Sequence, residues 1–268
     1  MKRKLTVLAL ACALLLSLAA CGGSGDDKTI TVGATPAPHA EILEVAKEVL
    51  AEQGYTLEIT EFDDYIMPNT AVEEEELDAN YFQHITYMNQ FNEDNGTHLA
   101  SAAEVHYEPF GIYAGKTASL DELQDGAQIA VPNDTTNEGR ALLLLQEQGL
   151  ITLTEDCGLE PTKDDIADNP HNYEIVELEA KLLPTTLQDV DIAVINGNYA
   201  IDAGLSIADA LAIESAEGEA ATAYANVLTV KEGHENDESI QALLAALESD
   251  EVRTFIEETY AGAVVPLF

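Results

Sequence analysis

Residues 30–62 read ITVGATPAPHAEILEVAKEVLAEQGYTLEITEF, and their pattern decides the fold class. Residues 30–32 are all β-branched and predict a strand, while residues 56–62 alternate polar and apolar side chains and predict another. Apolar residues recur at helical spacing between them, which predicts a helix over residues 39–53 that Gly54 ends. A strand, a helix and a strand in this order form a right-handed βαβ unit with parallel strands.

The same order of elements recurs further along the chain. Residues 128–132 predict a strand, and a helix over 139–148 follows after a turn. Residues 191–195 are almost all apolar, as expected of a parallel strand buried on both faces. The last predicted elements are helices over 239–247 and 252–260. We therefore expect an α/β fold made of two sheets, each with helices on both faces.

Three turns after predicted strands are rich in glycine, asparagine and other polar residues: 33–39, 133–140 and 196–199. In open α/β sheets, ligands lie beyond the carboxyl ends of the strands, where such turns lie. With two lobes, the predicted ligand site is the cleft between them.

The turn over residues 133–140 carries a scarce basic residue, Arg140. We expect Asn137 to cap the following helix and Arg140 to lie in its first turn. A guanidinium beside free helical N–H groups favours a carboxylate ligand. The alternative is a surface ion pair with one of the many acidic residues. The chain has 50 acidic and only 11 basic residues, so a functional arginine is favoured here.

Aromatic and histidine side chains also gather near chain turns. Their rings have an apolar body and a polar tip, which suits the wall of a small-molecule pocket. For any single one of them, core packing is the alternative. The residues concerned are Tyr65, Tyr81, Phe82, His84, Tyr87, Tyr107 and Phe110, and their spacing alone does not select among them.

The N-terminus has the pattern of an export signal with a lipid-attachment site. A cationic start is followed by an uncharged apolar run, which predicts a signal peptide over residues 1–20. Residues 18–21, LAAC, form a lipobox, so we expect cleavage before Cys21 and lipidation of its thiol. Residues 21–28 are polar and glycine-rich and predict a flexible tether. An uncleaved anchor is the alternative. With the lipid anchor, we expect the folded body on the extracytoplasmic face of the cell membrane.

Composition restricts the function classes. A formal net charge of −39 argues against nucleic-acid binding, which needs a basic surface. Of the three cysteines, Cys12 leaves with the signal and Cys21 takes lipid, so Cys157 alone remains and no internal disulfide is expected.

Motifs for catalysis are absent from the sequence. It contains no G-x-S-x-G, H-E-x-x-H, P-loop or G-x-G-x-x-G, so no enzyme activity and no cofactor are expected. No two histidines are spaced four apart, so no metal site is expected, although His84 and His106 converging in space is an alternative. A secreted hydrolase and a surface lipoprotein that acts through protein contacts are the competing function classes.

Several motifs in a fixed order carry a resemblance to a known family. They are VGATP (32–36), DYIMPN (64–69), DANYFQH (78–84), VPND (131–134), NEGRALLLL (137–145), AVINGNYA (193–200) and YANV (224–227). From about Thr29 to Phe268 the chain resembles the methionine-binding lipoproteins of the NlpA family, which supply methionine ABC importers. One departure is Asp134-Thr135, where relatives usually have Asp-Pro.

The resemblance implies a two-lobed, type II-like periplasmic-binding-protein fold. It implies lobe 1 over residues 29–110, lobe 2 over 111–225 and a return to lobe 1 over 226–268. The expected ligand is L-methionine or a close analogue, with D-methionine and methionine-containing dipeptides as alternatives. The expected partners are the permease and ATPase of the importer, and the protein is expected to be a monomer.

The resemblance also implies roles for individual residues. Arg140 would bind the ligand carboxylate, and Asn196 and Asn226 would bond the amino-acid head group. The thioether would be walled by Tyr65, Phe82, His84 and Tyr87.

Overall fold

The structure is a computed structural model that describes residues 28–215 and 222–268. The predicted signal peptide (1–20), with Cys12, lies outside the described residues. So do the predicted lipidation site Cys21 and all of the predicted tether except Lys28.

One sheet has six strands in the order β13-β4-β12-β3-β1-β2. β1 pairs in parallel with β2 and β3, whereas β12 runs antiparallel to its neighbours β3 and β4. The strands of this six-stranded sheet are β1 (Thr29–Ala34), β2 (Thr56–Glu61), β3 (Ala79–His84), β4 (Leu99–Tyr107), β12 (Ala225–Lys231) and β13 (Val265–Pro266). The helical segments that accompany it are η1 (Pro36–Ala40), α2 (Glu41–Glu52), α3 (Met67–Glu73), α4 (Ile85–Asn95), α9 (Glu238–Leu247) and α10 (Asp250–Tyr260).

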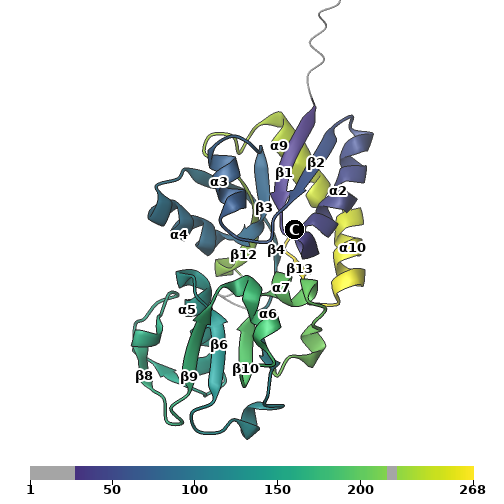
Figure 1. Ribbon diagram of the computed structural model, residues 1–268. Helices are drawn as coiled ribbons and strands as arrows, with labels where there is room; N and C mark the ends of the chain where they lie inside the picture. Colours follow the sequence, from purple (N-terminus) through teal and green to yellow (C-terminus); the bar gives the residue numbers. More distant parts are fainter. Residues whose placement is uncertain (1–27, 216–221) are drawn as a thin grey trace, which may run out of the picture.

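The other large sheet has five strands in the order β11-β5-β10-β6-β9. Its strands are β5 (Gly111–Ala114), β6 (Gln128–Pro132), β9 (Glu174–Leu178), β10 (Ile192–Ile195) and β11 (Ala212–Ile213). Its α-helices are α5 (Thr135–Glu147), α6 (Leu183–Thr186) and α7 (Gly197–Asp202), and short 3-10 turns are η2 (Leu120–Glu122), η3 (Lys163–Asp165), η4 (Ala180–Leu182) and η5 (Ile207–Asp209). A separate small sheet pairs β7 (Thr152–Leu153) with β8 (Ile166–Asp168). Figure 1 shows the two large sheets in separate halves of the molecule, with α5 and α7 between them.

The elements form where the apolar pattern predicts them. α2 buries Ile42, Leu43, Ala46 and Leu50 on one face, and every residue of β10 is buried. β1 and β2 are parallel, as the predicted βαβ unit requires. The α/β prediction for both sheets is therefore confirmed.

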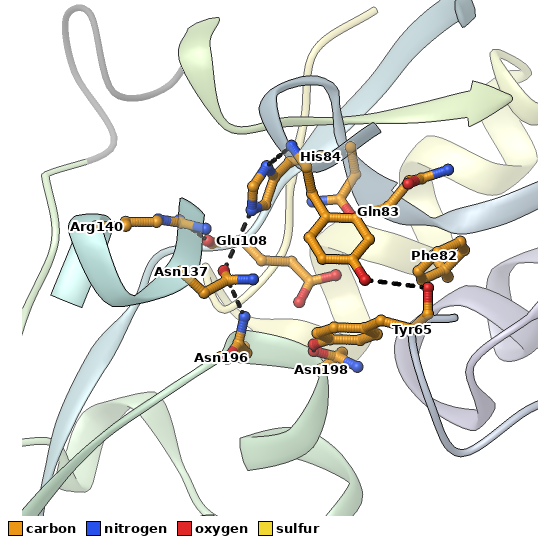
Figure 2. A pocket seen from close by; sticks show the side chains of 12 residues that line it. Tyr65, Phe82, Gln83, His84, Glu108, Asn137, Arg140, Asn196 and Asn198 are labelled. Carbon is orange, nitrogen blue, oxygen red and sulfur yellow. Dashed lines mark hydrogen bonds between the residues drawn. The ribbon is translucent and has the colours of Figure 1, made fainter. Parts of the chain in front are cut away.

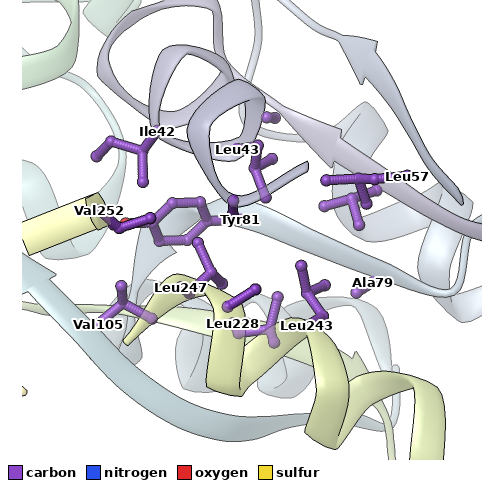
Figure 3. Packing of buried hydrophobic residues seen from close by; sticks show 14 of the residues in the cluster. Ile42, Leu43, Leu57, Ala79, Tyr81, Val105, Leu228, Leu243, Leu247 and Val252 are labelled. Atoms are coloured by element: carbon purple, nitrogen blue, oxygen red, sulfur yellow. The ribbon is translucent and has the colours of Figure 1, made fainter. Parts of the chain in front are cut away.

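The core of the six-stranded half lies under α2, α9 and α10. Figure 3 shows Leu43 from α2, Leu243 from α9 and Val252 from α10 converging around Tyr81 of β3. Tyr81 is fully buried, and its hydroxyl meets the imidazole of His106. The core therefore borders on a polar side chain, His106, which lies near the end of β4.

The chain crosses from one sheet to the other between β4 and β5, and it returns between β11 and β12. The strands of the six-stranded sheet lie within 29–107 and 225–266, and those of the five-stranded sheet within 111–213. We propose lobes at the boundaries predicted from the sequence, although β12 already begins at Ala225.

Candidate functional site

A cavity lies between the two large sheets. It brings together residues that are up to 161 positions apart in the chain, from Tyr65 to Asn226. All seven residues predicted as ligand contacts line it. The complete lining is Tyr65, Phe82, Gln83, His84, Tyr87, Glu108, Asn137, Arg140, Asn196, Gly197, Asn198 and Asn226.

One end of the cavity is aromatic. The ring of Tyr65 lies 5.7 Å from that of Phe82 and 5.6 Å from that of Tyr87, measured between centroids. Tyr199 stacks on the outer side of Tyr65 at 5.0 Å, and the Tyr65 hydroxyl donates to Asn198 Oδ1 at 2.7 Å. The stacking of Tyr199 and the hydrogen bond to Asn198 therefore join this aromatic wall, which belongs to the six-stranded half, to the five-stranded half.

Arg140 lies at the other end, in a setting that differs from the prediction. α5 begins at Thr135, so Arg140 is in its second turn, not its first. The predicted cap at Asn137 is also wrong: Asp134 is the N-cap, and its Oδ1 accepts from the backbone N–H of Asn137 at 3.0 Å. The carboxylate of Asp134 therefore occupies the helix N-terminus that the sequence predicted for the ligand.

The guanidinium of Arg140 is held in place on several sides. Its Nε and Nη2 donate to the carboxylate of Glu214 at distances of 2.6–3.1 Å, and Nη2 also donates to the carbonyl of Glu108 at 2.7 Å. Its Cζ lies 4.3 Å from the ring centroids of both Phe110 and Tyr224. Nη1 takes part in none of these contacts. Burial opposes the charge, but the Glu214 carboxylate outweighs it and raises the pKa of Arg140.

Asn137 is the centre of a buried polar network. Its Oδ1 accepts from Asn196 Nδ2 at 2.9 Å and lies 3.2 Å from His84 Nε2. Its Nδ2 donates to Asp134 Oδ1 at 2.8 Å. Asn196 Oδ1 is buried and has no hydrogen-bond partner among residues 28–215 and 222–268. An orphaned buried acceptor costs free energy unless a ligand supplies a donor.

Glu108 adds a buried carboxylate to the cavity (Figure 2). Its Oε1 lies 2.8 Å from His106 Nε2 and 3.3 Å from His39 Nε2. Burial raises the pKa of Glu108, and it lowers the pKa of His106 to about 3 and that of His39 to about 4, despite the opposing carboxylate at His39. Both rings are therefore neutral N–H donors, and both direct Nε2 toward Glu108.

His39 also orients an amide of the cavity wall. Its Nε2 lies 3.0 Å from Asn226 Oδ1, and its Nδ1 lies 2.7 Å from the hydroxyl of Thr35. Because Nε2 faces two acceptors, Glu108 and Asn226, it must carry the hydrogen, and Nδ1 accepts from Thr35. Asn226 thus uses its oxygen on His39 and keeps its amide nitrogen for the cavity.

Among residues 28–215 and 222–268, the cluster that could reach a common metal ion is His39, His106 and Glu108. This cluster differs from the alternative pairing of His84 with His106. His106 Nε2 is hydrogen-bonded to Glu108 Oε1, His39 Nε2 lies 3.3 Å from the same oxygen, and the Nδ1 atoms of both rings meet hydroxyl groups. The three residues therefore satisfy one another's hydrogen-bonding groups without an ion.

Comparison with known proteins places the chain in a family. The family described as NlpA lipoprotein matches residues 30–268. The chain belongs to the NlpA lipoprotein family. The D-methionine-binding lipoprotein MetQ of Escherichia coli is 41% identical over 260 residues, which cover 94% of each chain.

Solved structures of NlpA relatives have the same fold. A lipoprotein from Ruminococcus gnavus is 57% identical with a TM-score of 0.89, covering 90% of this chain and all (100%) of that one. A nutrient-binding protein from Burkholderia cenocepacia, solved with methionine bound, is 40% identical with a TM-score of 0.85 and covers 89% of this chain and 100% of its own. The two-lobed binding-protein fold, with its ligand cleft between the lobes, is thus confirmed.

Sequence reasoning missed five residues that line the cavity of this NlpA lipoprotein. Glu108 had a signal, because it is a lone acid between Tyr107 and Phe110 where the chain crosses between the sheets. Gly197 and Asn198 lie in a turn that was predicted as polar, and Asn137 was predicted only as a cap. Gln83 belongs to a buried amide cluster that only the fold assembles.

Two further observations concern the rest of the NlpA chain. Within the part of the chain that the structure describes, no helix is both long and apolar enough to cross a bilayer. Cys157 is a free thiol, half-buried beside the core of the five-stranded half.

Proposed function

We propose that this protein is a membrane-anchored solute-binding lipoprotein that captures methionine and delivers it to an ABC importer. The observation that carries the proposal is the polarity of the cavity. One end offers a guanidinium, a carboxylate and amides, and the other offers aromatic rings. This arrangement matches an amino-acid head group joined to an apolar thioether, and a relative with 40% identity binds methionine in its solved structure.

The donors and acceptors of the polar end give the head group one orientation. Arg140 Nη1 and the amide nitrogen of Asn226 are donors and would receive the ligand carboxylate. Glu108 and the orphaned Asn196 Oδ1 are acceptors and would receive the ammonium. This pose agrees with the roles predicted for Arg140, Asn196 and Asn226, and it adds Glu108 as the counter-charge of the ammonium.

The aromatic end would hold the thioether. Burying a methionine side chain contributes roughly 1.5–3 kcal/mol, and sulfur–aromatic contact adds about 0.3–1.5 kcal/mol. Micromolar binding requires about 8 kcal/mol. The polar end must therefore supply the larger part of the binding free energy.

The remaining parts of the proposal concern location and partners. Lipidation of Cys21 would hold the protein on the extracytoplasmic face of the cell membrane, and the tether would keep the two lobes clear of the headgroups. The partners would be the permease and ATPase of the importer, with the protein acting as a monomer and without enzyme activity.

Mass spectrometry of small molecules released from freshly purified protein tests the ligand. We expect methionine to be released, and titration calorimetry on the stripped protein should give sub-micromolar affinity for L-methionine. The same titration with D-methionine and a methionine-containing dipeptide distinguishes the alternative ligands. No heat of binding for any of the three would contradict the proposal, and a surface lipoprotein acting through protein contacts would then be favoured.

A further inference from the structure

We infer that Asp134 is a positioning residue that sets the polarity of Asn196 through Asn137, so that the cavity presents an acceptor to the ligand ammonium. The inference rests on the proposed function, because it assigns a cause to the orientation of one proposed contact. Asp134 does not line the cavity itself.

The hydrogen-bond relay from Asp134 through Asn137 to Asn196 begins at Asp134 Oδ1, which accepts three hydrogen bonds. Asp134 Oδ1 accepts from Asn137 Nδ2 at 2.8 Å, from the Asn137 backbone at 3.0 Å and from Thr136 Oγ1 at 3.2 Å. A carboxylate oxygen cannot donate. The side chain of Asn137 must therefore turn its nitrogen toward Asp134 and its oxygen toward the cavity.

A second anchor imposes the same orientation from the other half of the molecule. The backbone N–H of Tyr87 donates to His84 Nδ1 at 3.0 Å, so the neutral ring carries its hydrogen on Nε2. Burial lowers the pKa of His84 to about 3, which keeps the ring neutral. Nε2 then donates to Asn137 Oδ1 at 3.2 Å. Two groups with fixed roles thus agree on which end of the Asn137 amide faces Asn196.

Asn196 takes its orientation from Asn137. Since Asn137 presents an oxygen, Asn196 must present its nitrogen, and the two atoms lie 2.9 Å apart. The oxygen of Asn196 is what remains, buried in the cavity wall with no partner among the described residues. The reverse orientation would place two oxygens in contact at Asn137 and offer an N–H to the ligand. It would disfavour an ammonium at that position.

A double-mutant cycle with Asn196 tests whether Asp134 acts through it. Asp134→Ser keeps an N-cap acceptor but is too short to hold the Asn137 amide. We expect it to weaken L-methionine binding about tenfold in calorimetry, and less than about twofold in the Asn196→Ala background. The affinity for 4-(methylthio)butanoate, which lacks the amino group, should change less than about twofold, because this ligand has no ammonium to donate to Asn196 Oδ1.

Two further variants separate this role from helix capping. Asp134→Asn retains an oxygen for the cap but allows either amide orientation, so it should give a smaller loss that also disappears in the Asn196→Ala background. Ser249→Ala removes the side-chain cap of α10, remote from the cavity. It should lower the melting temperature and leave L-methionine affinity unchanged.

Equal losses of L-methionine affinity in the two backgrounds would overturn the inference. Equal losses of affinity for L-methionine and 4-(methylthio)butanoate would also overturn it, because either result would mean that Asp134 acts only as the N-cap of α5. If the unmodified protein binds no L-methionine, it is the proposed function that fails. If it binds L-methionine but the cycle shows no coupling, the relay alone fails.

Discussion

The two ends of the cavity differ in how their side chains are held. At the polar end, Arg140 and Glu108 are 3% and 5% exposed, and each is fixed by hydrogen bonds to groups outside the cavity. At the aromatic end, Tyr65 and Tyr87 are only half-buried and also line an opening at the surface. The side chains of the polar end are therefore preorganised and shielded from solvent, whereas the aromatic end lies partly at the surface.

This difference predicts where specificity arises. Preorganised polar groups discriminate strongly, because a ligand that lacks a partner leaves them unpaired. Apolar walls discriminate weakly, since a change of one methylene costs only about 1–3 kcal/mol. Substitutions at the polar end should thus reduce affinity far more than substitutions at the aromatic end.

Arg140→Ala is expected to have the largest effect on binding. Removing one partner of a buried charge pair costs about 2–5 kcal/mol, and Glu214 would also be left buried without its partner. L-Methionine affinity should fall at least about 30-fold in titration calorimetry. Arg253→Ala is the matched control, because Arg253 stacks on Phe268 and does not line the cavity. Comparable losses for the two variants would remove the distinction drawn for the polar end.

Phe82→Ala should have a smaller effect. The ring supplies one wall of the aromatic end, and the sulfur–aromatic term is about 0.3–1.5 kcal/mol, so affinity should fall up to about tenfold. Phe82→Leu retains most of the apolar volume and should lose less. Calorimetry with L-methionine and with norleucine, which lacks sulfur, separates the two contributions. A loss for Phe82→Ala that exceeds that for Arg140→Ala would reverse the comparison.

The prediction with the smallest effect concerns protonation of the buried histidines at the polar end. Burial lowers the pKa of His84 and His106 to about 3 and that of His39 to about 4. NMR of the imidazole rings should therefore show no titration of these three between pH 8 and about 5. Exposed His234 is the internal control, because its hydrogen bond to Asp237 raises its pKa. Titration of the buried rings near pH 6.5 would contradict the neutral network around Glu108.

The sign of the linked stability change follows from the same pKa values. Below about pH 6.5 the unfolded chain takes up protons on these histidines, whereas the folded rings stay neutral until about pH 4. Their contribution to the free energy of unfolding is therefore present above pH 6.5 and is lost as the pH falls toward 4. The raised pKa of Glu108 acts in the opposite direction: its contribution to the free energy of unfolding is lost as the pH rises.

Local sequence signals predicted the fold well. The strand over residues 128–132 matches β6 because a short apolar run there ends at Pro132, which removes a backbone donor. The predicted start of α5 was wrong because all of residues 133–137 are of types that can cap a helix, and the N-cap is Asp134 and not Asn137.

The site was predicted in part, and its partners were not. The family resemblance pointed to Arg140 and Asn226, and both line the cavity. Glu214 pairs with Arg140 across 74 positions and is one of 50 acidic residues, so nothing local in the sequence distinguishes it. The orientation of Asn196 depends on a chain of hydrogen bonds from separate elements, which only the folded structure assembles.

A crystal structure of the protein with L-methionine tests the central claim most directly. We predict that the carboxylate lies within hydrogen-bond distance of Arg140 Nη1 and the Asn226 amide nitrogen, and that the ammonium contacts Glu108 and Asn196 Oδ1. The sulfur should lie among the rings of Tyr65, Phe82 and Tyr87. A head group at the aromatic end, or methionine bound outside this cavity, would contradict the account.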